Sequence, residues 1–428
     1  MPLVENIAES PAAPAVATNS RLQERLRVLL FVCFCALLIF DPLALGIVDE
    51  WSVGLFEAGA AALLLLWAVE QVAASEIEAV WSPIYWPMIA FVGIVLVQLT
   101  FHQTAYQFAS LSELWLYIAY GVLIFVGTQL FRRQYLIRFG SIMTAFGSAY
   151  ALFALIQGFT SGGKIYWWIT PQAGSVYGSY VNHNHYAGLM ELLFPMALVP
   201  ALMGQSGKTK RLWLTFAATL MAASIFLSGS RGGMIALLVE IAFLAGFWIR
   251  DFSAKKAMAS VAVFCLVTAL FLAWVAPQQV GGRISNLHDP SRMLIHRDAV
   301  RMFLAHPLLG SGFGAFAVAF PHYRVFFDGF FVNHAHDDYL ELLLETGLLG
   351  FAAAVWFLVV MYREGFRNVA PEKTSASALI RTAALAGCSG FLAHSFMDFN
   401  LHIPGNAALF FVLCAAAVAG PPETSRST

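Results

Sequence analysis

Long apolar runs separated by short polar segments dominate this chain. Twelve runs of roughly 16 to 24 residues, the length that spans a bilayer as a helix, occupy residues 28–48, 53–74, 84–100, 111–130, 139–159, 186–203, 212–227, 232–249, 257–275, 339–362, 380–397 and 404–420. They are continuously apolar and lack the in-out alternation of barrel strands. The pattern predicts an all-α polytopic membrane protein with about 12 transmembrane helices, nine within residues 28–275 and three within 339–420.

One polar interruption is long enough to fold by itself. Residues 276–338, between the ninth and tenth runs, are too polar to span a membrane and too patterned to be disordered. Asp289 followed by Pro290 predicts a helix start, and this helix can run to about His306, ahead of Pro307. We expect a periplasmic cap of short helices between spans nine and ten.

On the predicted cap helix, Arg297 lies beside Met293, Val300 and Leu304 rather than opposite them. An arginine on an apolar face either snorkels towards the membrane surface or points into an enclosed anionic pocket. The residues alone leave both interpretations open.

Composition and charge fit the same picture. With 59% hydrophobic and 11% charged residues, the chain has too little polar surface for a soluble fold of 428 residues. If the N-terminus is cytoplasmic, seventeen of the 24 Lys and Arg residues fall on the inner side, as the positive-inside rule requires. The other seven and all 11 histidines fall on the outer side. This bias follows either from the length of the outer segments or from chemistry on that face.

The ends and the cysteines add little. Residues 1–27 are predicted to be a disordered cytoplasmic tail, and residues 421–428 a second cytoplasmic tail. All 5 cysteines lie within predicted spans, so neither a disulfide framework nor a cysteine metal site is indicated. A net charge of -1 argues against a nucleic-acid partner.

The richest polar motif opens the tenth span. Residues 333–350, NHAHDDYLELLLETGLLG, place His334, His336, Asp337 and Asp338 where a polar segment becomes an apolar helix. A polar cluster at a membrane edge suggests a site.

Two further motifs lie on the predicted outer side of spans six and eleven. Asn182, His183 and His185 open span six; the histidines are either metal ligands or hydrogen-bonding groups. Asp398 lies in HSFMDFNLHIPGN, residues 394–406, and either orients a histidine or an arginine or caps a helix end.

The turn SGSRGG, residues 228–233, joins spans seven and eight. Glycines around Arg231 leave backbone N–H groups near a helix N-terminus, a favourable place for an anionic oxygen, whereas the plainer interpretation is a turn with an arginine at the lipid headgroups. A second glycine run, HPLLGSGFGAF at residues 306–316, fails as a dinucleotide fingerprint because no strand precedes it. Its glycines are better interpreted as turn residues.

Together, SRGG, HPLLGSGFGAF, HAHDDYLELLLETGLLG and HSFMDFNLHIPGN resemble the motifs of the O-antigen ligase and polymerase family of bacterial envelope glycan enzymes, in this order and over residues 181–420. The ligases of that family carry His followed by Asn, Ser or Gln, nine residues, and Gly-x-x-Gly. His336, Gly347 and Gly350 reproduce the spacing, whereas Asp337 departs from it by placing an acid where an amide or hydroxyl is usual.

The resemblance implies transfer of a glycan from a polyprenyl-diphosphate carrier to an acceptor hydroxyl on the periplasmic face of the inner membrane, without a cofactor or a required metal. Its partners are then the lipid-linked donor, a lipid or glycan acceptor and membrane lipids. His336 is the expected general base, and Arg231 and Arg297 the expected diphosphate ligands. The expected supporting residues are Asn182, His183, His185, Arg301, His334, Asp337, Asp338 and Asp398.

Two alternatives remain. A polymerase of the same family joins lipid-linked repeat units, and the four motifs do not distinguish the acceptors. A transporter is the alternative of another class, since Glu57, Glu191 and Glu240 lie within predicted spans. No inverted repeat or pair of broken helices favours it.

Overall fold

The computed structural model describes residues 15–74, 77–132, 135–171, 174–249, 290–327, 329, 331–370 and 373–420, and this part of the chain folds into helices. The long helices are α1 (Ala15–Leu43), α2 (Glu50–Ala74), α3 (Tyr85–Thr100), α4 (Gln107–Phe131), α5 (Tyr135–Thr160), α6 (His183–Met203), α7 (Lys208–Ser228), α8 (Arg231–Ile249), α13 (Asp338–Val369), α14 (Ala376–His394) and α15 (Pro404–Val418). The shorter elements are α11 (Pro290–Ala305), α12 (Phe316–Ala319), η1 (Phe320–His322) and η3 (Asn400–His402).

Eight of these helices are long and apolar enough to cross a membrane, and α3 and α15 are apolar but shorter. With α8, the helices of the described residues match eleven of the twelve predicted runs. The remaining predicted span, 257–275, lies outside the described residues. The chain is therefore a polytopic membrane protein with an all-helical architecture.

The first helix starts earlier than expected. Residues 1–27 were predicted to be a disordered tail, yet α1 begins at Ala15. Arg27 forms an ion pair with the buried Glu70 of α2, and Gln23 donates a hydrogen bond to the same carboxylate at 3.2 Å. These contacts stabilise the helix beyond its apolar stretch, which a hydropathy pattern does not reveal.

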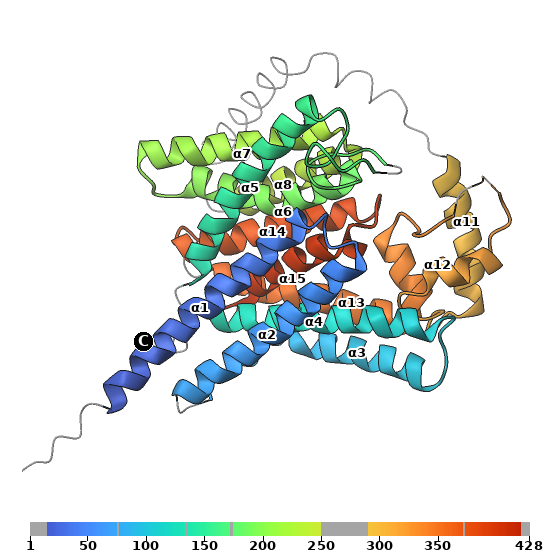
Figure 1. Cartoon of the computed structure of the whole chain (residues 1–428), viewed down its shortest axis with the longest axis horizontal. Helices are drawn as coiled ribbons and strands as arrows, with labels where there is room; N and C mark the ends of the chain where they lie inside the picture. Colours follow the sequence, from blue (N-terminus) through green and yellow to red (C-terminus); the bar gives the residue numbers. More distant parts are fainter. Residues whose placement is uncertain are drawn as a thin grey trace, which may run out of the picture.

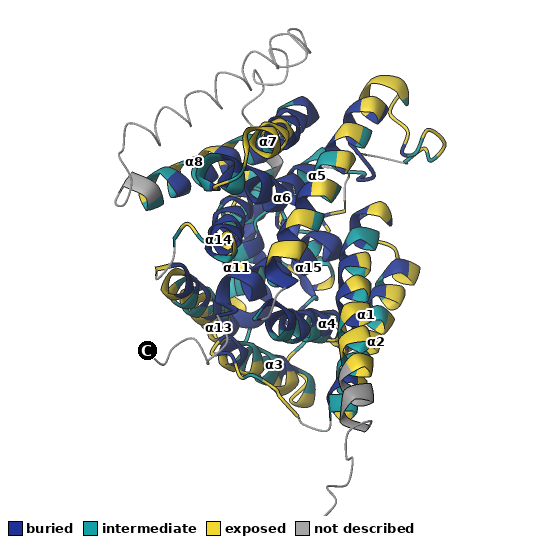
Figure 2. Cartoon of the chain, turned by 90° about the vertical axis from the view of Figure 1, so that its left-hand side faces the viewer, coloured by how far each residue is buried: buried dark blue, intermediate teal, exposed yellow. Residues whose placement is uncertain are grey.

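Burial separates the inner helices from the outer ones. Helices α6, α14 and α15 are buried almost throughout, and α6 packs against both α7 and α14 (Figure 2). The outer helices instead expose large apolar side chains, such as Leu65, Val72 and Leu212. Apolar residues both in the interior and on the outer surface are typical of a helical bundle that lipid surrounds.

Helices α11 and α12 lie at one end of the bundle, beyond the ends of α3, α4 and α13 (Figure 1). Ile295 and Met302 of α11 pack with Phe316 and Phe320 in a small apolar core of their own. These short helices lie within the segment for which a periplasmic cap was expected, and the cap itself stays a prediction. Asp289, the predicted N-cap of α11, lies outside the described residues.

Helix α13 is broken at Gly347, whose φ of 62° and ψ of −167° are not helical. The glycine loop docks into this break: the N–H groups of Leu348 and Leu349 donate to the carbonyls of Pro307 and Leu308 at 2.9 and 3.2 Å. A Cβ atom at Gly347 would lie 2.3 Å from the Leu308 carbonyl carbon. The glycine is needed both for its positive φ and for this close approach.

The three glycines of the loop, Gly310, Gly312 and Gly314, have φ values of +72°, +113° and +71°. They are turn residues, as their pattern in the sequence indicated. Glu345 of α13 fixes the loop by accepting hydrogen bonds from the N–H groups of Gly314 and Phe316, each at 2.9 Å. The break in α13 thereby anchors residues 307–316 next to the start of that helix.

Candidate functional site

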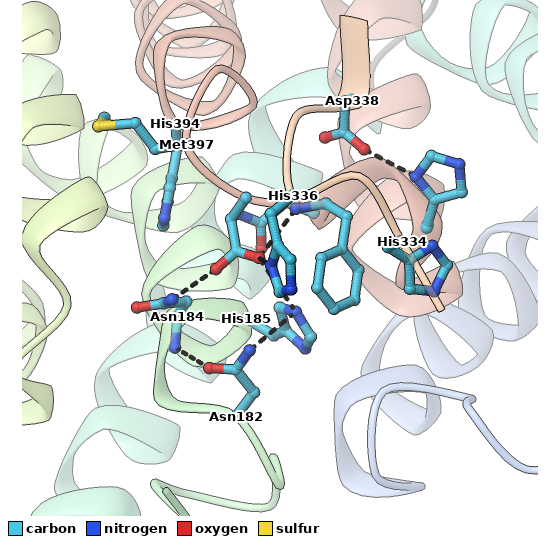
Figure 3. Close-up of polar contacts among 12 residues, drawn as sticks. Asn182, Asn184, His185, His334, His336, Asp338, His394 and Met397 are labelled. Atoms are coloured by element: carbon cyan, nitrogen blue, oxygen red, sulfur yellow. Dashed lines mark hydrogen bonds and ion pairs between the residues drawn. The ribbon is translucent and has the colours of Figure 1, made fainter. Parts of the chain in front are cut away.

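The polar residues of three separate segments meet at one place in the structure (Figure 3). The first turn of α6 provides one group, residues 331–338 ahead of α13 provide the second, and residues 394–402 between α14 and α15 provide the third. Three of the motifs that the sequence singled out are thus brought together by the packing of α6, α13 and α14.

Asp398 is the centre of the first half of this site, and its side chain is completely buried. Its Oδ1 atom lies 3.7 Å from His336 Nδ1 and 3.9 Å from His185 Nε2. Asn184 donates a side-chain hydrogen bond to Oδ2, and the Phe399 N–H donates to Oδ1 at 2.9 Å. We call Asp398, His336, His185 and Asn184 the Asp398 cluster.

These contacts keep Asp398 ionised. Burial alone would raise the pKa of the carboxyl group, but His336, His185 and His394 and the Phe399 N–H outweigh it and hold the pKa well below its usual value. A permanent negative charge beside an imidazole stabilises the imidazolium form, which is the form that a general base adopts once it has taken a proton.

His336 is the more accessible of the two histidines in the Asp398 cluster, because 35% of its side chain is exposed, against 9% for His185. Its backbone has a φ of 56°, a left-handed conformation that residues other than glycine rarely adopt. The turn is held on both sides: the Ala335 N–H donates to Glu341 Oε2 at 2.6 Å, and Asp337 caps α13. Strain of this kind at an accessible, buttressed histidine is typical of functional sites.

Asp337 does not act on His336 directly. Its carboxylate accepts hydrogen bonds from the N–H groups of Tyr339 and Leu340, both at 3.0 Å, as the N-cap of α13. Burial nevertheless raises the pKa of Asp337. The carboxylate that lies near His336 is Asp398, from a different segment.

Asn182 and the two histidines after it open α6. The Asn182 side chain accepts a hydrogen bond from the Asn184 N–H at 2.9 Å and so caps the helix, and its Nδ2 lies 3.3 Å from His185 Nε2. His185 belongs to the Asp398 cluster, whereas the backbone N–H of His183 donates to the Ser175 carbonyl at 2.9 Å.

The second half of the site contains His334, Glu341, His402 and Asp338, which we call the Glu341 cluster. Glu341 Oε1 lies 2.8 Å from His334 Nδ1 and 3.4 Å from His402 Nε2. His402 Nδ1 lies 2.8 Å from Asp338 Oδ1. Burial opposes a charge on His402, but Glu341 and Asp338 outweigh it and raise the pKa of His402 well above its usual value.

The Phe399 ring contacts histidines of both clusters. It is stacked on the His334 ring at a centroid distance of 4.2 Å and meets the rings of His336 and His185 edge-on at 5.0 and 4.8 Å. Phe399, Asn184 and Glu341 were not assigned roles from the sequence. The only signal for Glu341 was a carboxylate within the first turn of an apolar span.

Arg231 is the first residue of α8 and is exposed. The turn before it is shaped by Ser230, whose hydroxyl accepts a hydrogen bond from the Gly233 N–H at 3.1 Å. Gly232 lies against His394, since a Cβ atom there would be 2.3 Å from His394 Nε2, and His394 Nδ1 lies 2.8 Å from the buried Glu191. Because His394 is followed at four residues by Asp398, the turn that bears Arg231 is packed on the segment of the Asp398 cluster.

Arg297 and Arg301 lie elsewhere. Arg297 Nε donates to Asp298 Oδ1 at 3.1 Å, and its side chain is 55% exposed, on the same face of α11 as the exposed Met293 and Val300. Arg301 is exposed as well. The described residues place neither arginine among the histidines. Helix α11 reaches the site through Arg292, which donates to the carbonyl of Met397.

Residues 216–355 match the family described as O-antigen ligase. The match includes three of the four motifs, the SRGG turn, the glycine loop and the segment that carries His334 and His336, and it ends before Asp398. No curated protein matches the chain. The family match over residues 216–355, the order of the motifs and the helical bundle agree, which confirms the resemblance of this chain to the O-antigen ligase and polymerase family.

Proposed function

We propose that this protein is an inner-membrane glycosyltransferase of the ligase type. In this proposal it transfers a glycan from a polyprenyl-diphosphate carrier to an acceptor hydroxyl on the periplasmic face. The observation that carries the proposal is the Asp398 cluster: an accessible, conformationally constrained histidine, His336, beside the buried anionic carboxylate of Asp398 at 3.7 Å.

The reaction proceeds as a single displacement in this proposal. The acceptor oxygen attacks the anomeric carbon of the donor sugar, and its proton passes to His336. The bond between the anomeric carbon and the diphosphate oxygen breaks at the same time, so the anomeric configuration inverts. Asp398 stabilises the imidazolium that forms, since His336 Nδ1 faces it, while the accessible part of the ring is left for the acceptor.

The leaving diphosphate needs its growing negative charge stabilised. Arg231 is suited to this role because its guanidinium is a planar, permanently charged group at the N-terminus of α8, beside the segment of Asp398. Arg297, with Arg301, is the second candidate and would bind the donor further from the histidines. Since no step needs a metal ion, we expect transfer without added Mg²⁺ or Mn²⁺.

An apolar cavity of about 310 Å³ supports a lipid-linked substrate. Tyr339, Leu342, Phe396 and Leu401 line it, and Asp338 marks its end near the Glu341 cluster. In our proposal it receives part of a lipid chain while the sugars lie under the cap helices. Apolar burial next to a polar reaction centre is what such an amphipathic substrate requires.

The central test is transfer by purified enzyme from a lipid-linked donor after His336→Asn and His336→Ala. Asparagine tolerates the left-handed backbone but cannot act as a base. We expect both variants to lose transfer by at least about 100-fold and still to bind the donor. His322→Asn, an exposed histidine outside the site, is the matched control. Wild-type rates in His336→Asn would eliminate the mechanism.

The orientation is tested by cysteine labelling of intact cells. We expect a membrane-impermeant reagent to modify cysteines placed at the exposed positions Lys164 and Val325, and not at the exposed Lys208. The reverse pattern would put the site on the cytoplasmic side and would contradict the proposed substrates.

A polymerase remains the second function within the family. Glycan ladders on the polyprenyl carrier, made by the purified enzyme from donor alone, identify a polymerase. Polymer that is made normally but fails to reach its final anchor when the protein is deleted identifies a ligase.

A further inference from the structure

The Glu341 cluster has features that the transfer reaction does not use. His334, Glu341 and His402 each direct one ligand atom to a common point, and the three atoms lie within 4.8 Å of one another. The residues come from the loop before α13, from the first turn of α13 and from η3. Three chain segments therefore bring together imidazole and carboxylate side chains, which are common metal ligands in proteins.

The separations suit a small divalent ion. Two ligands at about 2.0–2.1 Å from a tetrahedral ion lie about 3.3–3.4 Å from each other. His402 Nε2 and Glu341 Oε1 already lie at 3.4 Å. His334 Nδ1, at 2.8 Å from the same oxygen and within 4.8 Å of the other ligand atoms, would need to withdraw from Glu341 by about half an ångström and to approach His402. This is a small movement for a side chain that is 29% exposed.

The ligands are also oriented by their neighbours. His402 Nδ1 is bonded to Asp338 Oδ1 at 2.8 Å, which leaves Nε2 directed at Glu341. A carboxylate that holds the outer nitrogen of a histidine is a frequent companion of zinc sites. Glu341 is fixed through Oε2 by the Ala335 N–H at 2.6 Å, and His334 is stacked on Phe399. Glu341 and His402 therefore need little rearrangement to receive an ion, and the movement falls on the partly exposed His334.

We propose that His334, Glu341 and His402 bind one divalent transition-metal ion, with Zn²⁺ the best match for two imidazoles and one carboxylate. A water molecule completes the tetrahedron. The ion joins residues 331–338 to η3 and thereby stabilises the loop that carries His336. Phe399 lies between this position and His336, so the ion has no contact with the reacting atoms. The proposal does not depend on the proposed transfer reaction.

The test is metal binding by the full-length protein in detergent. We expect about one equivalent of Zn²⁺ per chain in the wild type after growth with zinc, and loss of at least four fifths of it in His402→Gln and His334→Gln. The control His322→Gln, changed at a histidine outside the cluster, should keep the wild-type content. Zn²⁺ added to chelator-treated wild type should raise Tm by several degrees and leave Tm of His402→Gln unchanged.

A second measurement does not require a folded variant. Co²⁺ added to chelator-treated wild-type protein should give the visible absorption of a tetrahedral site, and Zn²⁺ should abolish it. Absence of this absorption together with an unchanged Tm on adding Zn²⁺ would overturn the proposal, and protonated His402 alone would then hold the two carboxylates together. Equal metal content in the wild type and in His402→Gln would overturn it as well. Neither result depends on transfer activity.

Discussion

The Asp398 cluster and the Glu341 cluster are built from the same kinds of residue but differ in how closely carboxylates approach the histidine ring nitrogens. In the Glu341 cluster, His402 has a carboxylate oxygen within 3.4 Å of each ring nitrogen, and His334 has one within 2.8 Å. In the Asp398 cluster, the described residues place no carboxylate closer than 3.7 Å to His336, whose side chain is about one third exposed. A histidine whose ring nitrogens have close carboxylate partners stabilises the fold. A histidine whose ring is partly exposed beside a buried carboxylate is able to accept and release a proton.

The backbone sharpens this contrast. His336 has a left-handed backbone conformation, whereas His334 and His402, among the described residues, do not. His334 and His336 are separated by one alanine, and both rings contact Phe399 in different ways: His334 is stacked on it, whereas His336 meets it edge-on. The strain at His336 is compensated by Glu341 and Asp337, which hold the two adjacent backbone segments. The Glu341 cluster thus helps to hold the backbone conformation of His336 in the Asp398 cluster.

The largest effect in these comparisons is expected for the arginines. Arg231→Lys keeps the charge but loses the fork that matches a diphosphate, and we expect transfer to fall about 100-fold, or roughly 3 kcal/mol. Arg297→Lys should have a smaller effect, because Arg297 pairs with Asp298 and lies away from the histidines. Initial rates with lipid-linked donor measure both. An equal loss in the two variants would mean that α11 also binds the diphosphate.

The next largest effect is expected from replacing Asp398, compared with Asp338, since both carboxylates lie near histidines. Asp398→Asn should lower transfer about tenfold, roughly 1.4 kcal/mol, because the imidazolium of His336 loses its neighbouring anion. Asp338→Asn should leave transfer per folded molecule within about threefold and lower the stability by about 1–3 kcal/mol, since buried His402 loses its hydrogen-bonded partner. Rates and Tm, measured on the same preparations, separate the two outcomes. The opposite pattern would exchange the roles of the clusters.

The smallest effect is the pH dependence of stability. The pKa of Asp398 is lower in the folded protein than the usual value of about 4. Its contribution to stability is therefore fully present above that value and is lost as pH falls towards the folded pKa. The difference in Tm between the wild type and Asp398→Asn should be constant from about pH 5 to 8 and shrink below about pH 4. A difference that changes near pH 6 would show that a histidine, not Asp398, controls it.

Much of the fold could be predicted from the sequence, because a helix that spans a membrane must bury its own backbone hydrogen bonds and present apolar side chains over a fixed length. Eleven predicted runs coincide with helices for this reason. The break at Gly347 could not be predicted in this way. It depends on the backbone of residues 307–310, which enters the gap between two halves of one apolar run.

The sequence indicated several residues of the candidate site but not which of them contact one another. The motifs identified His336, His185 and Asp398, and the ligase spacing selected His336 over His334. The sequence also grouped Arg297 with Arg231, and it placed Asp337 directly after the expected base His336. In the structure Asp337 caps a helix, and Arg297 forms its ion pair with Asp298. Neighbours in sequence at the start of a helix point in different directions, so adjacency does not determine contact.

By itself, the sequence determined that this protein is a helical membrane bundle that resembles the O-antigen ligase and polymerase family, with a polar cluster at the start of the tenth predicted span. Only the tertiary structure decided which carboxylate each histidine meets. Asn184 and Asp398, which share a hydrogen bond, are 214 residues apart. Hydropathy is a local property of one helix, whereas a contact between helices depends on how each is rotated and tilted against its neighbours.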